Sequence, residues 1–500
     1  MSDSPTPPDN GRASTGVPGL DTLLGGGFPI HRLHLIEGDP GSGKTTLALQ
    51  FLLEGRRAGE SCLYVTLSET ATELRGIAAS HGWSLDGLEL CELAPSEAGR
   101  PDEQYTLYHP AEIELGQMVK SILSATDRVH PSRVVLDSLS ELRLLARDSL
   151  RYRRQILALK EFFSTRTCTV LVLDDHTSDS EDLQLRSIAH GVVLLEQEPY
   201  EYGRSRRRLR IVKIRGVAAI EGFHDFRILR GGLSVFPQLG SVSRGPALPT
   251  PVSSGVRELD RLLGGGLSWG TTTLFMGPAG VGKSSVAAQY VTATAVESPA
   301  AIYLFDERRS IFVSRCEALG MDIQPRLKSG HLTLEQIEPG ELSPGEFAHR
   351  VSERVEKNGC RIVLIDSLNG YLNAIPMGHA PLVRMHELLA YLNERQVATL
   401  LVAAQHGVIG SHMVSPIDVS YLADCVVLLR FFEAEGRIRK AISVVKKRTG
   451  KHESAIRELS LESGTVRVGE PLTDFHGVMT GVPQYRGGSG PLLDHGKTRE

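Results

Sequence analysis

The sequence predicts an α/β protein made of two homologous domains, each built around a mostly parallel sheet with helices on both faces. The first observation is an internal repeat: Gly16 and Lys44 recur as Gly255 and Lys283, each 239 residues later. A constant offset of this kind indicates a duplicated domain. The second observation is that apolar runs rich in β-branched residues alternate with helical segments in both halves, which is typical of a parallel sheet buried on both faces.

The repeat sets the expected domain limits. The first domain is expected over residues 14–235 and the second over 252–470. Residues 236–251 form the expected linker, because they are rich in Gly, Pro and Ser and lack a sustained period. We expect disordered tails at 1–13 and at 471–500.

Matching strands and helices are expected in the two copies. In the first copy, strands are predicted over 31–38, 61–69, 132–140 and 167–175, with a helix over 45–59. In the second copy, strands are predicted over 271–277, 300–307, 360–369 and 397–405, with a helix over 284–295. The strands are nearly continuous apolar runs, and several end at a glycine or an aspartate.

Charge and hydropathy exclude some classes of protein. The formal net charge is −4, from 55 basic and 59 acidic residues, which disfavours a protein that grips nucleic acid or anionic lipid over a broad surface. No run approaches 18 apolar residues, so no membrane span is expected. The first residues show neither the basic nor the apolar part of a signal peptide, and we expect a cytoplasmic protein.

A phosphate-binding motif follows the first strand of each copy. Residues 38–45 and 277–284 both match G-x-x-x-x-G-K-[ST]. In such a P-loop the glycines let backbone N–H groups curl around a phosphate, and the lysine reaches the β- and γ-phosphates. A chance Gly-rich turn is a poor explanation, because both copies place the motif between a strand and a helix. The expected nucleotide-binding residues are Gly38, Gly41, Ser42, Gly43, Lys44, Thr45 and Thr46 in the first copy, and Gly277, Gly280, Val281, Gly282, Lys283, Ser284 and Ser285 in the second.

An aspartate ends a later apolar strand in each copy. Asp137 and Asp366 occupy this position, and such a carboxylate beside a P-loop holds the Mg²⁺ shell. With the P-loop hydroxyls, the expected metal-binding residues are Thr45 and Asp137 in the first copy and Ser284 and Asp366 in the second.

The segment before each P-loop, S-[ST]-G-V-x-x-L-D-x-L-L-G-G-G, resembles that of the RecA-like ATPases of the circadian clock protein KaiC family. The resemblance covers nearly all of residues 14–470 and is densest over 424–459. It implies two tandem RecA-like P-loop NTPase domains that use ATP and Mg²⁺. It also implies a homo-oligomeric ring, usually hexameric, with ATP held between neighbours. Its output would be slow hydrolysis or Ser/Thr autokinase activity that signals to an unidentified protein partner.

The family places an acidic pair after its second strand, where a carboxylate orients water or accepts a proton. Spacing aligns this pair with Ser68-Glu69 and with Asp306-Glu307, so Glu69, Asp306 and Glu307 are the candidate catalytic acids. The alternative is that a glutamate at a strand end is a solvated helix-start residue. Because the first copy has lost one acid, we hypothesise that the second domain hydrolyses ATP faster and that the first mainly holds nucleotide.

Two basic pairs recur near the end of each copy. Lys213 and Arg215 match Lys446 and Arg448, and alternate positions on a strand send both side chains of a pair to one face. The resemblance implies that these residues reach the γ-phosphate held by a neighbouring subunit, as arginine fingers do. The alternative is a basic edge strand kept soluble by its charge.

Ser420 is the candidate phosphoacceptor. In the family, adjacent Ser and Thr residues before the last Asp-containing strand are phosphorylated. Counting back from Asp424 aligns Ser420 with the serine and Tyr421 with the threonine, so a two-site cycle is not expected. The alternative is a serine that serves only as a turn or N-cap residue.

Two other functions share the same core. A DNA-dependent ATPase of the recombinase or helicase kind would need basic or aromatic channel loops, but the candidate segments 176–187 and 407–418 are acidic or nearly neutral. The basic run 204–210 is interpreted as a solvated strand edge, because no aromatics are interleaved with it. Nucleic acid is therefore not expected as a partner. The other alternative is a scaffold that nucleotide holds together without turnover.

Overall fold

A computed structural model shows two compact units, residues 1–238 and 239–500. It describes residues 11–93, 110–146, 148–175, 182–199, 204–240, 250–296, 298–338, 340–375, 381–405, 419–462, 464–478 and 484–485. Of the two candidate channel segments, residues 176–181 of the first and all of the second, 407–418, lie outside these residues. No helix in the described part of the chain is long and apolar enough to cross a membrane.

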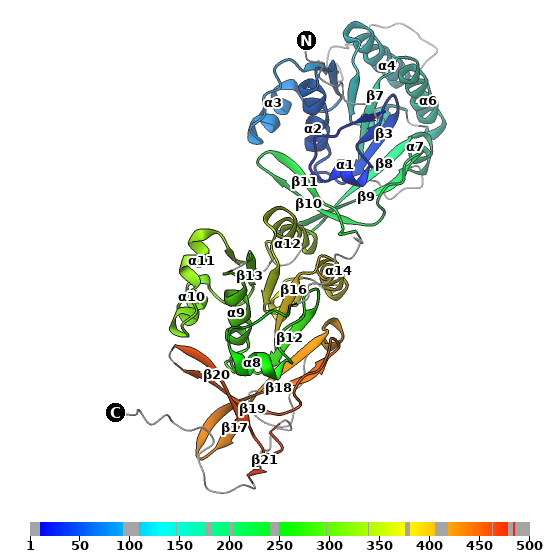
Figure 1. Cartoon of the computed structure of the whole chain (residues 1–500). Helices are drawn as coiled ribbons and strands as arrows, with labels where there is room; N and C mark the ends of the chain where they lie inside the picture. Colours follow the sequence, from blue (N-terminus) through cyan, green and yellow to red (C-terminus); the bar gives the residue numbers. More distant parts are fainter. Residues whose placement is uncertain are drawn as a thin grey trace. The chain divides into compact units, whose positions relative to one another are not determined.

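The first unit contains a nine-stranded sheet in the order β11-β10-β9-β8-β3-β7-β6-β4-β5 (Figure 1). The six strands from β8 to β5 are parallel, and β9, β10 and β11 extend the sheet in antiparallel fashion. The strands are β3 (Leu33–Gly38), β4 (Cys62–Thr66), β5 (Glu89–Glu92), β6 (Arg133–Asp137), β7 (Thr169–Asp175), β8 (Gly191–Glu198), β9 (Arg206–Ile214), β10 (His224–Leu229) and β11 (Gly232–Phe236). A small pair, β1 (Arg12–Ala13) and β2 (Phe28–Pro29), precedes them.

The second unit repeats this sheet strand by strand, in the order β14-β13-β15-β16-β12-β17-β18-β19-β20. Its strands are β12 (Thr272–Gly277), β13 (Ala300–Leu304), β14 (Leu332–Gln336), β15 (Ile362–Asp366), β16 (Ala398–Ala404), β17 (Cys425–Ala434), β18 (Arg437–Lys447), β19 (Arg457–Glu462) and β20 (Thr465–Pro471), with a small pair β21 (Phe475–His476) and β22 (Gln484–Tyr485). We call residues matched when they occupy the same position in the two repeats, by strand register or by their distance from a glycine that both repeats share.

Helices cover both faces of each sheet. In the first unit they are α1 (Leu20–Leu23), α2 (Lys44–Arg57), α3 (Ala71–Ser80), α4 (Pro110–Val129), α5 (Leu139–Ala146), α6 (Ser149–Thr165) and α7 (Asp182–Ile188). In the second unit they are α8 (Arg257–Leu262), α9 (Lys283–Thr294), α10 (Arg309–Ala318), α11 (Ile323–Ser329), α12 (Pro344–Asn358), α13 (Leu368–Asn373) and α14 (Pro381–Glu394), with a 3₁₀ turn η2 (Ser420–Leu422).

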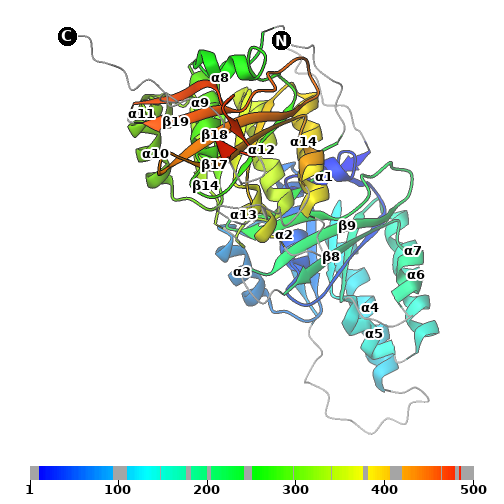
Figure 2. The same cartoon turned by 90° about the horizontal axis from the view of Figure 1, so that it is seen from below.

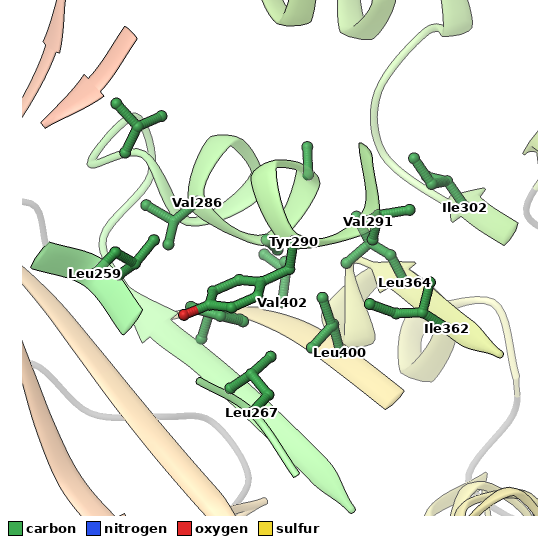
Figure 3. Packing of buried hydrophobic residues seen from close by; sticks show 14 of the residues in the cluster. Leu259, Leu267, Val286, Tyr290, Val291, Ile302, Ile362, Leu364, Leu400 and Val402 are labelled. Atoms are coloured by element: carbon green, nitrogen blue, oxygen red, sulfur yellow. The ribbon is translucent and has the colours of Figure 1, made fainter. Parts of the chain in front are cut away.

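Side chains of the central strands point alternately to the two faces of the sheet, which explains the two layers of helices. Leu35 of β3 belongs to an apolar cluster with residues of α4, α5 and α6, whereas Ile36 belongs to a cluster with residues of α2 and α3. These two groups of helices cover opposite faces of the sheet (Figures 1 and 2). In the second unit, Tyr290 of α9 lies over β12, β15 and β16 in the core shown in Figure 3. Successive side chains of a strand point to opposite faces, so apolar runs buried on both sides require helices on both sides. The predicted fold class is confirmed.

The interpretation of residues 204–210 as a strand edge is wrong. Residues 206–210 form the first part of β9, which lies between β8 and β10 inside the sheet. Arg208 pairs with Glu196 at 2.7 Å and with Glu198 at 2.6 Å on β8. Arg208 therefore forms ion pairs within the sheet. The sequence did not reveal these pairs, because the glutamates lie on another strand.

Candidate functional site

The P-loops follow the carboxyl ends of β3 and β12 and lead directly into α2 and α9. Gly43 and Gly282 precede the helices with φ of 107° and 111°, in the left-handed region that favours glycine. A Cβ at Gly282 would also lie 2.3 Å from Cδ1 of Leu461. The loop can therefore close tightly and present the first N–H groups of each helix to an anion.

Two matched residues of the P-loops use their side chains differently. The side chain of Val281 is buried in the apolar core, so only its backbone N–H is available to a phosphate. The matched Ser42 has a buried hydroxyl with no hydrogen-bond partner among the described residues.

A hydroxyl and a carboxylate meet beside each P-loop. Thr45 Oγ1 donates to Asp137 Oδ2 over 3.0 Å, and in the second unit Ser284 lies near enough to Asp366 to lower the pKa of that carboxylate. Burial has the larger effect and raises the pKa of both aspartates. Asp366 Oδ2 is buried without a partner in the described part of the chain. These oxygen donors fit Mg²⁺, which prefers carboxylates, hydroxyls and water.

The second strand of the first unit adds a tyrosine to this site. Tyr64 of β4 is fully buried and donates its O–H to Asp137 Oδ2 over 2.5 Å. Its matched residue in the second unit is Ile302, so Asp366 receives no such bond. The sequence did not single out Tyr64, because its position opposite Asp137 depends on strand register.

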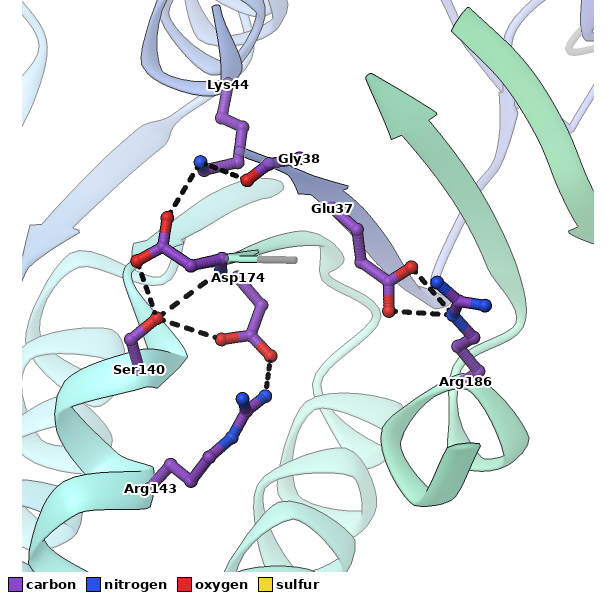
Figure 4. Close-up of polar contacts among 8 residues, drawn as sticks. Glu37, Gly38, Lys44, Ser140, Arg143, Asp174 and Arg186 are labelled. Atoms are coloured by element: carbon purple, nitrogen blue, oxygen red, sulfur yellow. Dashed lines mark hydrogen bonds and ion pairs between the residues drawn. The ribbon is translucent and has the colours of Figure 1, made fainter. Parts of the chain in front are cut away.

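The P-loop lysines have different partners in the two units. Lys44 Nζ donates to the carbonyl of Gly38 over 2.6 Å (Figure 4). It also donates to the carbonyl of Asp39 over 3.1 Å and pairs with Asp175 Oδ1 at 2.9 Å. Lys283 Nζ donates to the carbonyl of Pro278 over 2.7 Å, and burial lowers its pKa to about 8. The residue matched to Asp175 in the second unit is Ala404.

A polar network anchors Asp175. Ser140 Oγ lies 3.1 Å from Asp175 Oδ2 and 3.0 Å from Asp174 Oδ1. Asp174 is buried and ion-paired with Arg143 (Figure 4). Sequence analysis missed this pair of acids, although two adjacent carboxylates at the end of an apolar strand were a visible signal.

The candidate catalytic acids lie close to the metal-site aspartates. Glu69 Oε2 is buried without a partner among the described residues, and burial followed by the charge of Asp137 raises its pKa. Burial also raises the pKa of Glu307, but this carboxylate is ion-paired with Arg315 at 2.8 Å. Asp306 accepts a hydrogen bond from the hydroxyl of Ser367.

A cavity of about 400 Å³ opens over the second P-loop. Opposite the P-loop, Arg315 and Lys440 supply positive charge and Leu319 and Leu461 supply apolar surface. This combination suits a polyphosphate attached to a flat, apolar base. The sequence did not identify Arg315 or Lys440, since they come from a helix and a strand far from the motif.

A family model for the KaiC ATPase matches residues 13–240 and 252–473, which is most of the chain and both units. The chain belongs to the KaiC ATPase family. It is 26% identical over 486 residues to the circadian clock protein KaiC3 of Synechocystis, covering 95% of each chain. It is 23% identical to the circadian clock oscillator protein KaiC of Parathermosynechococcus lividus, covering 96% of this chain and 92% of that one. It is 24% identical to KaiC of Synechococcus elongatus, covering 94% and 91%.

The first basic pair of this KaiC-family chain lies away from its own P-loop. Lys213 pairs in register with Val192 of β8, which lies opposite Leu35 of β3. Leu35 is three residues before Gly38, or about 10 Å along the strand. Lys213 Nζ donates to the carbonyl of Arg186, and Arg215 donates to that of Ser187 over 2.9 Å, at the end of α7.

The second basic pair lies at the matched end of its own sheet. Lys446 donates to the carbonyls of Ser420 and Ala423 over 3.0 and 2.7 Å, and Arg448 approaches Asp424 at 3.4 Å. The structure therefore brings Lys446 and the candidate acceptor Ser420 together. It brings neither of them to the P-loop of the same unit.

Proposed function

We propose that both KaiC domains bind Mg²⁺-ATP and hydrolyse it, at sites that a neighbouring subunit of a homo-oligomeric ring completes. The observation that carries this proposal is the position of the basic pairs. Lys213 and Lys446 lie toward the amino ends of β3 and β12, whereas the P-loops follow the carboxyl ends. A basic residue at the opposite end of the sheet lies away from the γ-phosphate of its own P-loop, so we propose that it contacts one held by a neighbouring subunit.

The residues of each unit support distinct tasks in this reaction. Lys44 and Lys283 would bind the β- and γ-phosphates, while Thr45 with Asp137 and Ser284 with Asp366 would hold the metal. Bound Mg²⁺ would neutralise charge on the phosphates. Glu69 and Glu307 would orient the attacking water and accept its proton. The lysine or arginine of the neighbour would stabilise charge that develops on the γ-phosphate.

Complementation between defective subunits tests the shared site. One variant carries Lys44→Ala and Lys283→Ala, so it lacks both P-loop lysines. The other carries Lys213→Ala, Arg215→Ala, Lys446→Ala and Arg448→Ala. Each alone should be inactive, and a mixture should recover hydrolysis, because mixed rings contain some intact junctions. An inactive mixture that still forms rings would refute the shared site. So would a wild-type rate of hydrolysis per chain that stays constant when the protein is diluted to monomers.

We further propose that Ser420 accepts a phosphoryl group in trans. Its hydroxyl oxygen would attack the γ-phosphorus of ATP on the neighbour, the bond to the β-phosphate oxygen would break, and ADP would leave. Glu307 of the neighbour's second unit, which lies beside that ATP, would take the hydroxyl proton. The contact between Lys446 and the Ser420 carbonyl supports this proposal, since it places the acceptor beside the residue that is proposed to reach the same phosphate.

Incubation with γ-labelled ATP and Mg²⁺ separates the possible outputs. Label retained on the wild-type chain and on the control Ser454→Ala, but lost in Ser420→Ala, would support the autokinase. Free phosphate with an unlabelled chain would leave an ATPase switch acting on an unidentified protein partner. No turnover at all would favour the nucleotide-held scaffold, and stimulation by single-stranded DNA would favour the DNA-dependent ATPase.

A further inference from the structure

The first P-loop lysine already has an anionic partner within its own unit. Lys44 Nζ lies 2.9 Å from Asp175 Oδ1, and the lysine side chain is only 9% exposed. A P-loop lysine binds the β- and γ-phosphates of a nucleotide. Asp175 therefore competes for the group that a γ-phosphate would use.

The position of Asp175 is set by several independent contacts. Its backbone lies opposite Gly38, the first residue of the P-loop. Ser140 Oγ lies 3.1 Å from its other carboxylate oxygen and accepts a hydrogen bond from its backbone N–H over 3.3 Å. The preceding residue, Asp174, is fixed by its ion pair with Arg143. The Asp175 side chain is 40% exposed, so solvent still reaches it.

The second unit has the same backbone arrangement without the carboxylate. Ala404 lies opposite Gly277, and Asn369 accepts from the Ala404 N–H over 2.8 Å, as Ser140 does from Asp175. Lys283 has no carboxylate within ion-pair distance among the described residues. The two units thus form a natural comparison of a P-loop with and without this anion.

We infer that Asp175 makes the first unit discriminate against the γ-phosphate, so that this site prefers ADP over ATP. A γ-phosphate brings further negative charge to Lys44, and like charges a few ångströms apart repel strongly in a partly desolvated site. ADP brings only its β-phosphate to Lys44 and leaves the γ-phosphate position uncharged. This inference rests on the proposed binding of nucleotide at the first P-loop.

Nucleotide titration of the full-length chain tests it. The Lys283→Ala background removes nucleotide binding at the second site. The probes are two fluorescent nucleotides, N-methylanthraniloyl ADP and the non-hydrolysable triphosphate N-methylanthraniloyl AMP-PNP. Asp175→Ala should tighten the triphosphate at least tenfold and change ADP binding less than threefold. Asp127→Ala, which removes a surface carboxylate paired with Arg166, is the matched control and should change neither.

Introducing a carboxylate in the second unit tests the same inference without replacing Asp175, so a folding defect of Asp175→Ala cannot explain both results. In a Lys44→Ala background, Ala404→Asp should weaken the triphosphate at the second site at least tenfold relative to ADP. An unchanged ratio of the two affinities in Asp175→Ala, or a weaker triphosphate, would overturn the inference while leaving nucleotide binding intact. Absence of binding to the first site in every variant would instead refute that site, and the inference with it.

Discussion

Replacing Lys283 with methionine should stabilise the second unit in the absence of nucleotide. Burial lowers the pKa of this lysine from 10.5 to about 8. Each pKa unit corresponds to about 1.4 kcal/mol, so the folded unit carries roughly 3 kcal/mol of unfavourable lysine charge at pH 7. Methionine has a similar length and no charge, and should recover most of this free energy of unfolding.

The gain should depend on pH in one direction. Between pH 8 and 10.5 the unfolded chain binds more protons at Lys283 than the folded chain does. Stability of the wild-type unit should therefore rise with pH across this window. The advantage of Lys283→Met should be full below pH 8 and should vanish as pH approaches 10.5.

The two tryptophans allow each unit to be followed separately. Trp83 packs against the core of the first unit and Trp269 against that of the second. In a Trp83→Phe background, Trp269 fluorescence during denaturant unfolding reports the second unit alone. Lys283→Met should raise the midpoint at pH 7 and should abolish the further stabilisation that Mg²⁺-ATP gives the wild type.

Lys44 supplies the matched control. Because Lys44 is ion-paired with Asp175, Lys44→Met removes a favourable contact and should not stabilise the first unit, followed by Trp83 in Trp269→Phe. The reasoning would be refuted if Lys283→Met were no more stable than wild type at pH 7. It would also be refuted if its advantage stayed constant up to pH 10.5.

Three further substitutions test the candidate catalytic groups, each with the P-loop lysine of the other unit replaced. Glu69→Gln should lower the rate of ATP hydrolysis by about 10²-fold or more. In the wild type, this rate should rise with pH through the raised pKa of Glu69. A Glu69→Gln variant that hydrolyses ATP at the wild-type rate would exclude Glu69 as the base. Arg315→Ala should raise the pKa of Glu307 further and move the acid limb of the pH–rate profile upward, whereas an unmoved limb would show that their ion pair does not matter. Tyr64→Phe should lower the free energy of unfolding by about 1–3 kcal/mol, because Asp137 loses the hydrogen bond from Tyr64. The loss also raises the pKa of Asp137, so the Mg²⁺ concentration needed for half-maximal activity should rise. A variant as stable as the wild type would contradict this reasoning.

Much of the fold could be predicted from local patterns. The repeat, the two P-loops and the apolar strands ending at Asp137 and Asp366 each depend on residues close in sequence. The hydrogen bond of Thr45 to Asp137 followed from the motif chemistry, as did the position of Ser284 near Asp366. These features are visible because helix and strand periods, turn glycines and motif spacing act over short stretches of chain.

The partners of the site residues could not be predicted in the same way. Tyr64, Asp175 and Arg315 reach the site through strand register or through the face of a helix, which no local pattern specifies. The misinterpretation of residues 204–210 has the same cause, because the pairing of Arg208 with Glu196 and Glu198 depends on β9 lying beside β8. Sequence reasoning identified the candidate phosphate-binding groups, but not the charged residues that lie beside them.

The two units differ in which of their site residues has a charged partner: the P-loop lysine in the first unit and the candidate catalytic glutamate in the second. In the first, the lysine is neutralised by Asp175, while Glu69 has a carboxylate oxygen without a partner among the described residues. In the second, the lysine has no carboxylate partner in the described part of the chain, while Glu307 is held by Arg315. Ile77 and Ala404, the residues matched to Arg315 and Asp175, carry no charge.

This exchange of partners predicts different slow steps rather than one active and one inactive site. The first unit would be limited by admission of the γ-phosphate past Asp175, and its base would then act at once. The second would bind ATP readily and would be limited by release of Glu307 from Arg315. Rapid mixing should therefore show a rate that depends on ATP concentration over a wide range in a chain with only the first site, and early saturation in a chain with only the second. Identical concentration dependence in the two chains would show that the exchanged charges do not control turnover.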